Sequence, residues 1–271
     1  MKVILSGGGT GGHIYPALTI ADQIKKLRPD AQIIFVGTQQ GLEKNIIPRY
    51  GYPLRYIEIA GFKRSLSFDT LRSFGKLFTG LIGANSLISE IKPDLVIGTG
   101  GYVCGPMVFL AALRGIPTAI QEQNAMPGVT NKILARFVKK VFLGYREAEK
   151  YFTGKSRKIY TGNPIRSEIL SNKRSEAVKF FGLDPEKQTI LVSGGSRGAQ
   201  SINKAMLYVE QALSGRHDVQ VLHATGEANY EAYVKELNQK GSVEDNIIVK
   251  PYLHDMPMAL AAADLAVFRA G

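Results

Sequence analysis

The stretch that decides the fold is Ser6-Gly7-Gly8-Gly9-Thr10-Gly11-Gly12-His13. It follows the apolar run Val3-Ile4-Leu5, and apolar residues then recur at positions 17, 20, 21, 24 and 27, the spacing of a helix. The stretch therefore predicts a strand, a glycine turn and a helix. Glycines let the backbone approach a ligand closely, and the free N–H groups at a helix N-terminus favour phosphate. We predict a phosphate-bearing ligand at this turn.

The same glycines also satisfy the G-x-G-x-x-G spacing of dinucleotide-binding turns, through Gly7, Gly9 and Gly12. Such a site needs an acidic residue roughly 20 residues further on, at the end of the second strand, to hold a ribose. The second predicted strand, Ile33-Ile34-Phe35-Val36, runs into Gly37-Thr38-Gln39-Gln40, which holds no carboxylate. This weakens the dinucleotide interpretation. A tight turn without any ligand is the structural alternative.

The chain of 271 residues is long enough for two domains, and 45% hydrophobic content is ordinary for a protein with a buried core. No segment reaches the ~18 uninterrupted apolar residues of a membrane span, and the apolar residues before Gly7 are too few for a secretion signal. The single cysteine, Cys104, cannot form an internal disulfide, which fits a reducing cytosol. We expect it to be a small buried hydrophobe rather than a nucleophile.

Lys and Arg number 34 against 23 Asp and Glu, so the formal net charge is +11. Such a charge favours anionic partners, and nucleic acid, nucleotide-sugars and the anionic cytoplasmic face of a membrane are all candidates. The sequence has neither a zinc-finger cysteine pattern nor an aromatic ribonucleoprotein motif. We therefore expect no nucleic-acid partner.

Strand-like runs alternate with amphipathic helical stretches throughout, which predicts an α/β fold of parallel sheets with helices on both faces. A turn at Gly162-Asn163-Pro164 predicts a boundary, with a first domain at residues 1–162 and a second at 163–271. Strands are expected near 3–6, 33–37, 54–58, 95–98, 118–121, 140–144, 158–161, 189–192, 219–223, 246–250 and 264–268. Helices of the second domain are expected near 174–181, 201–213, 229–239 and 255–263. We predict two Rossmann-like domains that face each other across a cleft.

The last predicted strand, residues 264–268, runs into Arg269-Ala270-Gly271. A strand with such a turn normally leads into a helix that covers the sheet. We expect the chain to be truncated at its C-terminus and the second domain to be incomplete, because a sheet face and a strand edge would otherwise be uncovered.

Five motifs follow one another in a fixed order along the chain. After the opening turn come Gly98-Thr99-Gly100-Gly101-Tyr102-Val103-Cys104-Gly105-Pro106, Gln121-Glu122-Gln123-Asn124, Gly162-Asn163-Pro164-Ile165-Arg166 and Gly194-Gly195-Ser196-Arg197-Gly198-Ala199. Over essentially the whole chain this order resembles the MurG family of glycosyltransferases. The resemblance implies the two-domain GT-B fold and inverting transfer of N-acetylglucosamine from UDP-N-acetylglucosamine to the 4-hydroxyl of the muramyl sugar of lipid I. It also implies a peripheral location at the cytoplasmic face of the bacterial cell membrane, in peptidoglycan synthesis.

Inversion in one displacement needs a base near the acceptor hydroxyl and a group that stabilises the departing UDP. The resemblance implies that His13, which can titrate near neutral pH, is the base or a group that orients the acceptor or the diphosphate, and Glu122 is the competing base. A histidine with only a structural role is the alternative for His13. A carboxylate that holds nearby backbone or a cation is the equal alternative for Glu122. The chain has no Asp-x-Asp motif, so we expect no metal and no cofactor, and helix N-termini and an arginine in their place.

The resemblance also implies substrate contacts in the first domain. Thr10, Gly11 and Gly12 match a loop that lies against substrate phosphate and sugar, and Asn124 matches a substrate-contacting asparagine. Most members of the family have His where Gln121 stands, which is a mild departure.

Three further contacts are implied for the nucleotide. Arg166 matches an arginine near the diphosphate, where a guanidinium suits two phosphate oxygens, although a surface arginine at a linker is its alternative. Ser196 matches a serine that contacts the nucleotide and could equally be a helix cap. Leu253 aligns with a residue whose backbone faces uracil, while its side chain is expected in the core.

Residues 62–92 are the candidate membrane-binding segment. Apolar residues are interleaved there with bases: Phe62, Leu66, Phe68, Leu71, Phe74, Phe78, Leu81 and Ile82 with Lys63, Arg64, Arg72, Lys76 and Lys92. This composition suits docking on an anionic membrane surface, where lipid I lies. A helix that buries its apolar face in its own domain is the alternative.

Two other functions remain open from the sequence alone. One is a different GT-B activity, such as a UDP-sugar epimerase or another lipid-linked glycosyltransferase. The other is a non-catalytic acceptor-binding or membrane-binding fragment.

Overall fold

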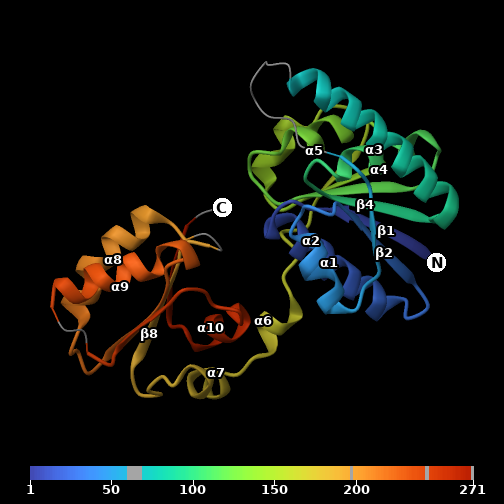
Figure 1. Cartoon of the computed structure of the whole chain (residues 1–271). Coiled ribbons are helices and arrows are strands. Elements are labelled where there is room, and N and C mark those ends of the chain that lie inside the picture. The colour runs from blue at the N-terminus through green and yellow to red at the C-terminus, as the bar shows by residue number, and fades with distance from the viewer. Residues whose placement is uncertain (60–68, 196–197, 242–243, 270–271) are drawn as a thin grey trace. The chain divides into compact units, whose positions relative to one another are not determined.

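The computed structural model describes residues 1–59, 69–195, 198–241 and 244–269, with the side chains of 69–77 and 168 outside the description. The chain divides into two compact units, Met1–Arg166 and Ser167–Gly271 (Figure 1). The division falls just after the turn at Gly162, where the Arg166 guanidinium still stacks 4.7 Å from the ring centroid of Tyr15.

The first unit contains a parallel sheet with strand order β3-β2-β1-β4-β5-β6-β7. Its strands are β1 (Lys2–Gly7), β2 (Gln32–Gly37), β3 (Leu54–Tyr56), β4 (Leu95–Gly100), β5 (Thr118–Glu122), β6 (Lys140–Leu143) and β7 (Arg157–Tyr160). Its helices are α1 (Gly11–Leu27), α2 (Glu43–Ile46), α3 (Asp69–Ile91), α4 (Cys104–Leu113) and α5 (Val129–Leu134), with 3-10 turns η1 (Ile47–Tyr50) and η2 (Arg146–Tyr151). All seven predicted strands are confirmed.

Strand β1 is the centre of this unit. Val3, Ile4 and Leu5 are fully buried, because one core cluster packs on each face of the sheet. The chain passes from β1 to β2 on one side and later enters β4 on the other, so the winding direction reverses between β1 and β4. In such sheets ligands bind at the carboxyl ends of the strands at this point. Both predicted glycine turns of this unit begin there.

The second unit is a parallel sheet with strand order β10-β9-β8-β11. Its strands are β8 (Gln188–Ser193), β9 (Val219–Ala224), β10 (Ile247–Lys250) and β11 (Leu265–Phe268). Its helices are α6 (Ser167–Ser171), α7 (Arg174–Phe181), α8 (Gln200–Leu213), α9 (Tyr230–Gln239) and α10 (Met256–Ala262), with the 3-10 turn η3 (Glu227–Asn229). The predicted strands and the helices from α7 onward are confirmed. Strand β11 pairs with β8, and all four of its residues are exposed.

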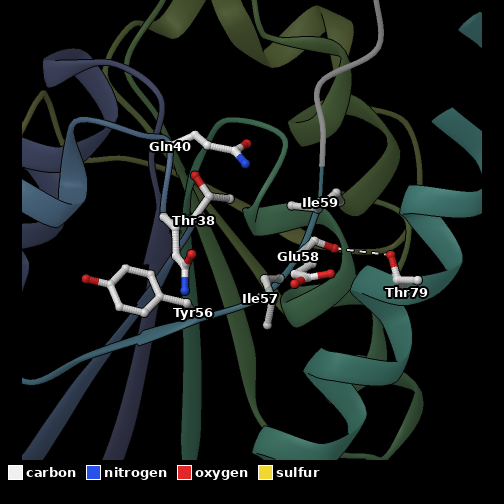
Figure 2. Close-up of a pocket in the computed structure, with 8 residues that line it drawn as sticks. Thr38, Gln40, Tyr56, Ile57, Glu58, Ile59 and Thr79 are labelled. Atoms are coloured by element: carbon white, nitrogen blue, oxygen red, sulfur yellow. Dashed lines mark hydrogen bonds between the residues drawn. The ribbon is translucent and has the colours of Figure 1, made fainter. Parts of the chain in front are cut away.

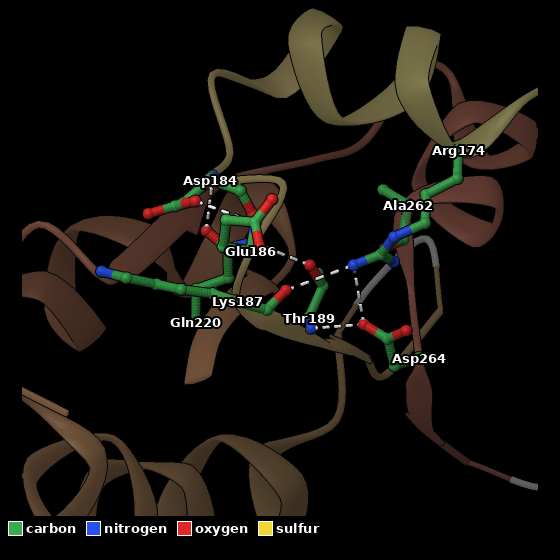
Figure 3. A network of polar contacts seen from close by, with 8 residues as sticks. All are labelled: Arg174, Asp184, Glu186, Lys187, Thr189, Gln220, Ala262 and Asp264. Atoms are coloured by element: carbon green, nitrogen blue, oxygen red, sulfur yellow. Dashed lines mark hydrogen bonds and ion pairs between the residues drawn. The ribbon is translucent and has the colours of Figure 1, made fainter. Parts of the chain in front are cut away.

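One ion pair ties the start of α7 to the sheet of the second unit (Figure 3). The Arg174 guanidinium lies 3.0 Å from a carboxylate oxygen of Asp264, and it also donates to the carbonyls of Ala262 and Lys187. The same Asp264 oxygen accepts a 2.7 Å hydrogen bond from the N–H of Thr189. The contact therefore fixes the beginning of β11 against the beginning of β8.

A buried polar trio lies in the core of the second unit, and sequence patterns gave no sign of it. Glu210 on α8 accepts hydrogen bonds from the Nδ1 of His223 at 2.7 Å and from the hydroxyl of Tyr233 at 2.8 Å. Burial and the Glu210 carboxylate hold the pKa of the Tyr233 hydroxyl above its usual range. The three side chains form hydrogen bonds with one another through most of their polar atoms. Buried polar groups in proteins are usually paired in this way.

Candidate active site

The first glycine turn connects β1 to α1. Gly9 has φ +84°, a conformation that side chains rarely adopt, and Thr10 is the extended residue that precedes the helix. A Cβ on Gly7 would lie 1.9 Å from the Oγ1 of Thr99, so glycine is required there. The Thr99 hydroxyl donates a 2.7 Å hydrogen bond to the carbonyl of His13. The end of β4 therefore fixes the backbone of His13.

The second glycine turn lies directly against the first. Gly100 and Gly101 have φ values of +106° and +80°. A Cβ on Gly100 would lie 2.8 Å from the Cδ2 of His13, and one on Gly101 would lie 2.5 Å from the carbonyl oxygen of Gly8. The predicted motif at the end of β4 thus makes room for the imidazole ring and for the turn that carries it.

The tautomer of His13 follows from its partners. Its Nδ1 lies 3.0 Å from the carbonyl oxygen of Gly8 and 3.3 Å from the Oγ1 of Thr10. A carbonyl oxygen can only accept, so Nδ1 carries a hydrogen, and in the neutral ring Nε2 carries the lone pair. No described residue hydrogen-bonds to Nε2. The ring lines a pocket of about 180 Å³ together with Gly100, Gly101, Tyr102, Glu122, Asn124, Gly128, Thr130 and Asn131.

Glu122 ends β5 at the wall of this pocket with only 1% of its surface exposed. One carboxylate oxygen accepts from the backbone N–H of Asn124 at 3.0 Å and from its side-chain amide at 2.9 Å. The other accepts from the N–H of Gly128 at 3.2 Å and from the side-chain amide of Asn131 at 2.9 Å. Four donors use the four lone-pair positions of a carboxylate. The geometry is that of a group that holds the loop after β5, the alternative raised for Glu122.

The structure brings three predicted residues, His13, Glu122 and Asn124, to one pocket. Gly11 and Gly12 form the first turn of α1 beside them. Arg166 contacts the first unit instead, where it donates a 3.4 Å hydrogen bond to the hydroxyl of Tyr50 and stacks over Tyr15.

The glycine turn of the second unit lies between β8 and α8. Gly198 has φ +71°, and a Cβ there would lie 1.9 Å from the carbonyl oxygen of Thr225. Ser196, a predicted nucleotide contact, lies outside the described residues. Leu253 is 5% exposed and packs in a core cluster with Leu191 and Leu222, so its side chain is a core residue.

Sequence reasoning missed Glu43. Residues 37–40 hold no carboxylate, but the chain folds back after β2 and brings Glu43 to the end of that strand. Glu43 is 1% exposed and accepts from the N–H and the hydroxyl of Thr38, at 2.8 and 2.9 Å, and from the N–H of Gly9 at 3.0 Å. The sequence signal that could have indicated a buried Glu43 is the pair of glycines shortly before it, Gly37 and Gly41. Its contacts are internal, so the weakened dinucleotide interpretation gains no support.

Cys104 begins α4 behind the pocket. Burial raises the pKa of its thiol to about 12, a hydrogen bond with the Gly100 backbone partly offsets this, and the Glu122 carboxylate adds to the increase. The thiol is buried, which confirms the expectation of a small buried side chain at this position.

Two further pockets adjoin this edge of the sheet. One, of about 390 Å³, lies at the ends of β2 and β3 and is lined by Thr38, Gln39, Gln40, Tyr56, Ile57, Glu58, Ile59 and Thr79 (Figure 2). The other, of about 320 Å³, is almost entirely apolar and includes Leu81, Phe109, Val129 and Ile133. The apolar pocket shares Tyr102 and Thr130 with the pocket that holds His13. The two pockets are therefore neighbours.

Within the described ranges, no helix combines the length and the apolar character needed to cross a bilayer. The same ranges hold no group of three His, Cys, Asp or Glu side chains that could bind a metal ion.

The fold and the site define a two-domain α/β protein of the GT-B type. A crystal structure of MurG from Acinetobacter baumannii is similar, with a TM-score of 0.71 and 28% identity, over 100% of this chain and 74% of that one. The UDP-GlcNAc 2-epimerase of Neisseria meningitidis has a TM-score of 0.69 over 100% of this chain and 78% of its own. It is 11% identical, so that likeness concerns the fold alone.

The chain belongs to glycosyltransferase family 28. The N-terminal domain of that family matches residues 3–143 and its C-terminal domain matches residues 189–271. A relative from Acetivibrio thermocellus, a UDP-N-acetylglucosamine--N-acetylmuramyl-(pentapeptide) pyrophosphoryl-undecaprenol N-acetylglucosamine transferase, is 49% identical over all of this chain and 73% of its own length.

Proposed function

We propose that the chain transfers N-acetylglucosamine from UDP-N-acetylglucosamine to the 4-hydroxyl of the muramyl sugar of lipid I, a polyprenyl diphosphate. The name of the A. thermocellus relative supports this donor and this lipid-linked acceptor. The observation that carries the proposal is the His13 ring, with its Nε2 lone pair, in a pocket between two glycine turns at the reversal point of the sheet.

In the proposed reaction, the acceptor oxygen forms a bond to the anomeric carbon while Nε2 of His13 takes the hydroxyl proton. The bond from that carbon to the UDP oxygen breaks in the same step, and UDP leaves with the electron pair, so the configuration inverts. Thr10, Gly11 and Gly12 bind phosphate or sugar of the substrate, since free N–H groups at the start of α1 favour an anion. Asn124, held by Glu122, contacts the substrate.

On the donor side, we propose that the glycine turn of the second unit, Ser196 included, binds the nucleotide, and that the backbone at Leu253 faces the uracil. Arg166 lies near the diphosphate in this proposal. Its guanidinium is the kind of group that pairs with two phosphate oxygens. Its stacking on Tyr15, two positions beyond His13, supports a place close to the reacting groups.

The function is tested by incubating the chain with radiolabelled UDP-N-acetylglucosamine and a lipid I analogue. Labelled glycolipid and UDP in equal amounts are expected. Release of UDP without labelled glycolipid would contradict the proposal. Conversion of the donor to an epimeric UDP-sugar would favour the epimerase alternative. Only the similarity of fold to a UDP-GlcNAc 2-epimerase supports that alternative.

We further propose that the first unit docks on an anionic membrane surface through α3, α4 and α5, which lie side by side (Figure 1). Large apolar side chains are exposed there, among them Phe78 and Ile82 on α3 and Val129 and Ile133 on α5. Lys132 and Arg136 lie on or next to α5. Bases beside exposed apolar groups suit an anionic bilayer. Residues 62–68 and the side chains of residues 69–77, which the sequence analysis also singled out, lie outside the description.

A vesicle-binding measurement tests the docking surface. The double substitution Phe78→Asp with Ile82→Asp is expected to weaken partition into vesicles containing anionic lipid by about tenfold or more, because burial of one large apolar side chain contributes about 1.5–3 kcal/mol. Leu170→Asp, at an exposed leucine of the second unit, is the matched control and should leave partition unchanged. Equal partition of the double variant and the unmodified chain would refute this surface.

A further inference from the structure

We propose that Glu43 is a positioning residue for His13, and that it acts through the peptide group between Gly8 and Gly9. The inference rests on the proposed role of His13 as the base. The N–H of that peptide group belongs to Gly9 and donates to the Oε2 of Glu43 at 3.0 Å. Its carbonyl belongs to Gly8 and accepts from the Nδ1 of His13 at 3.0 Å. One rigid, planar amide therefore joins the carboxylate to the imidazole.

The enclosure of Glu43 by backbone shows that the carboxylate is built into the turn. A Cβ on Gly8, Gly37 or Gly41 would lie 2.6, 2.5 or 2.0 Å from the nearest atom of the Glu43 side chain. Among the residues that the structure describes, Glu43 has no ion-pair partner. A buried carboxylate without a cation must be held by hydrogen bonds, and here they come from Thr38 and Gly9.

Hydrogen bonds in a chain polarise one another in a low-dielectric interior. The negative charge on Glu43 attracts the amide hydrogen of Gly9, which draws electron density toward the carbonyl oxygen of Gly8. That oxygen becomes a stronger acceptor for the Nδ1–H of His13. The imidazole is therefore kept in the tautomer whose Nε2 can take a proton, and the imidazolium that forms is stabilised.

The two oxygens of Glu43 allow this role to be separated from simple support of the fold. Oε1 accepts both hydrogen bonds from Thr38 at the end of β2, and Oε2 accepts the one from Gly9. Thr38→Val removes a bond to the same carboxylate without touching the link to His13. Glu210→Gln neutralises a fully buried carboxylate in the second unit. Both serve as matched controls for Glu43→Gln.

The first test is nuclear magnetic resonance of the ¹⁵N-labelled histidine rings in the full chain. We expect the Nδ1–H tautomer for His13, and at least a partial shift to the Nε2–H form in Glu43→Gln, with no change in either control. A main Nε2–H form in the unmodified chain would overturn the proposal without any variant, as would an unchanged tautomer in folded Glu43→Gln.

The second test is a double-mutant cycle on the transfer rate. Glu43→Gln is expected to lower kcat by about tenfold or more, within the about hundred- to ten-thousandfold contribution of a general base. In a His13→Ala background it should change kcat by less than about twofold, because the two residues act as one unit. The same tenfold loss in both backgrounds would mean that Glu43 acts independently of His13. A His13→Ala variant with full turnover would instead refute the proposed base.

Discussion

Replacing His13 by alanine is expected to lower transfer turnover by about a hundredfold to ten-thousandfold, the usual contribution of a general base. The expectation follows from the ring's position, with Nδ1 bound to the Gly8 carbonyl and Nε2 available to the acceptor hydroxyl. The loss should appear in kcat rather than in KM for either substrate, since the group acts on the transferring proton.

Steady-state kinetics with the labelled donor measures this loss. His217→Ala removes an exposed histidine of the second unit and should leave kcat unchanged. Unchanged turnover in the His13 variant would exclude it as the base.

The second large effect concerns stability. Glu122→Gln keeps the size of the side chain but turns one oxygen into an NH₂ group that faces two hydrogen-bond donors. Each buried donor left without an acceptor costs about 1–3 kcal/mol, so the free energy of unfolding of the first unit should fall by about 2–6 kcal/mol. Denaturant titration of the chain measures it.

Glu147→Gln, which neutralises an exposed acid on η2, is the control and should change the free energy of unfolding little. A Glu122→Gln variant as stable as the unmodified chain would show that the four hydrogen bonds contribute nothing net.

Much of the fold could be predicted because its signals are local. The opening stretch shows an apolar strand, glycines and helical periodicity in direct succession, and the structure has β1, a turn and α1 there. The same succession of an apolar strand, a glycine turn and a helix recurs at β8 and α8, and it likewise indicates the second unit. A central parallel strand such as β1, which is buried on both faces, appears in the sequence as a continuous apolar run.

The contacts of the site could not be predicted in the same way, because they depend on tertiary folding. The motif at residues 121–124 pointed to Glu122 and Asn124, yet only the structure shows that the carboxylate accepts from four donors. Glu43 follows β2 by a short loop, and its burial depends on how that loop turns back toward Gly9. Glu210, His223 and Tyr233 lie on three elements and meet only in the folded core.

The three glycines around Glu43 limit which substitutions this chain can accept. Gly8, Gly37 and Gly41 are separated in the chain, yet each leaves room for the same carboxylate. A lineage could accept a larger residue at any of these positions only after it had lost or shortened the glutamate. In this chain, therefore, a larger residue at any of the three glycines and the full-length glutamate exclude each other.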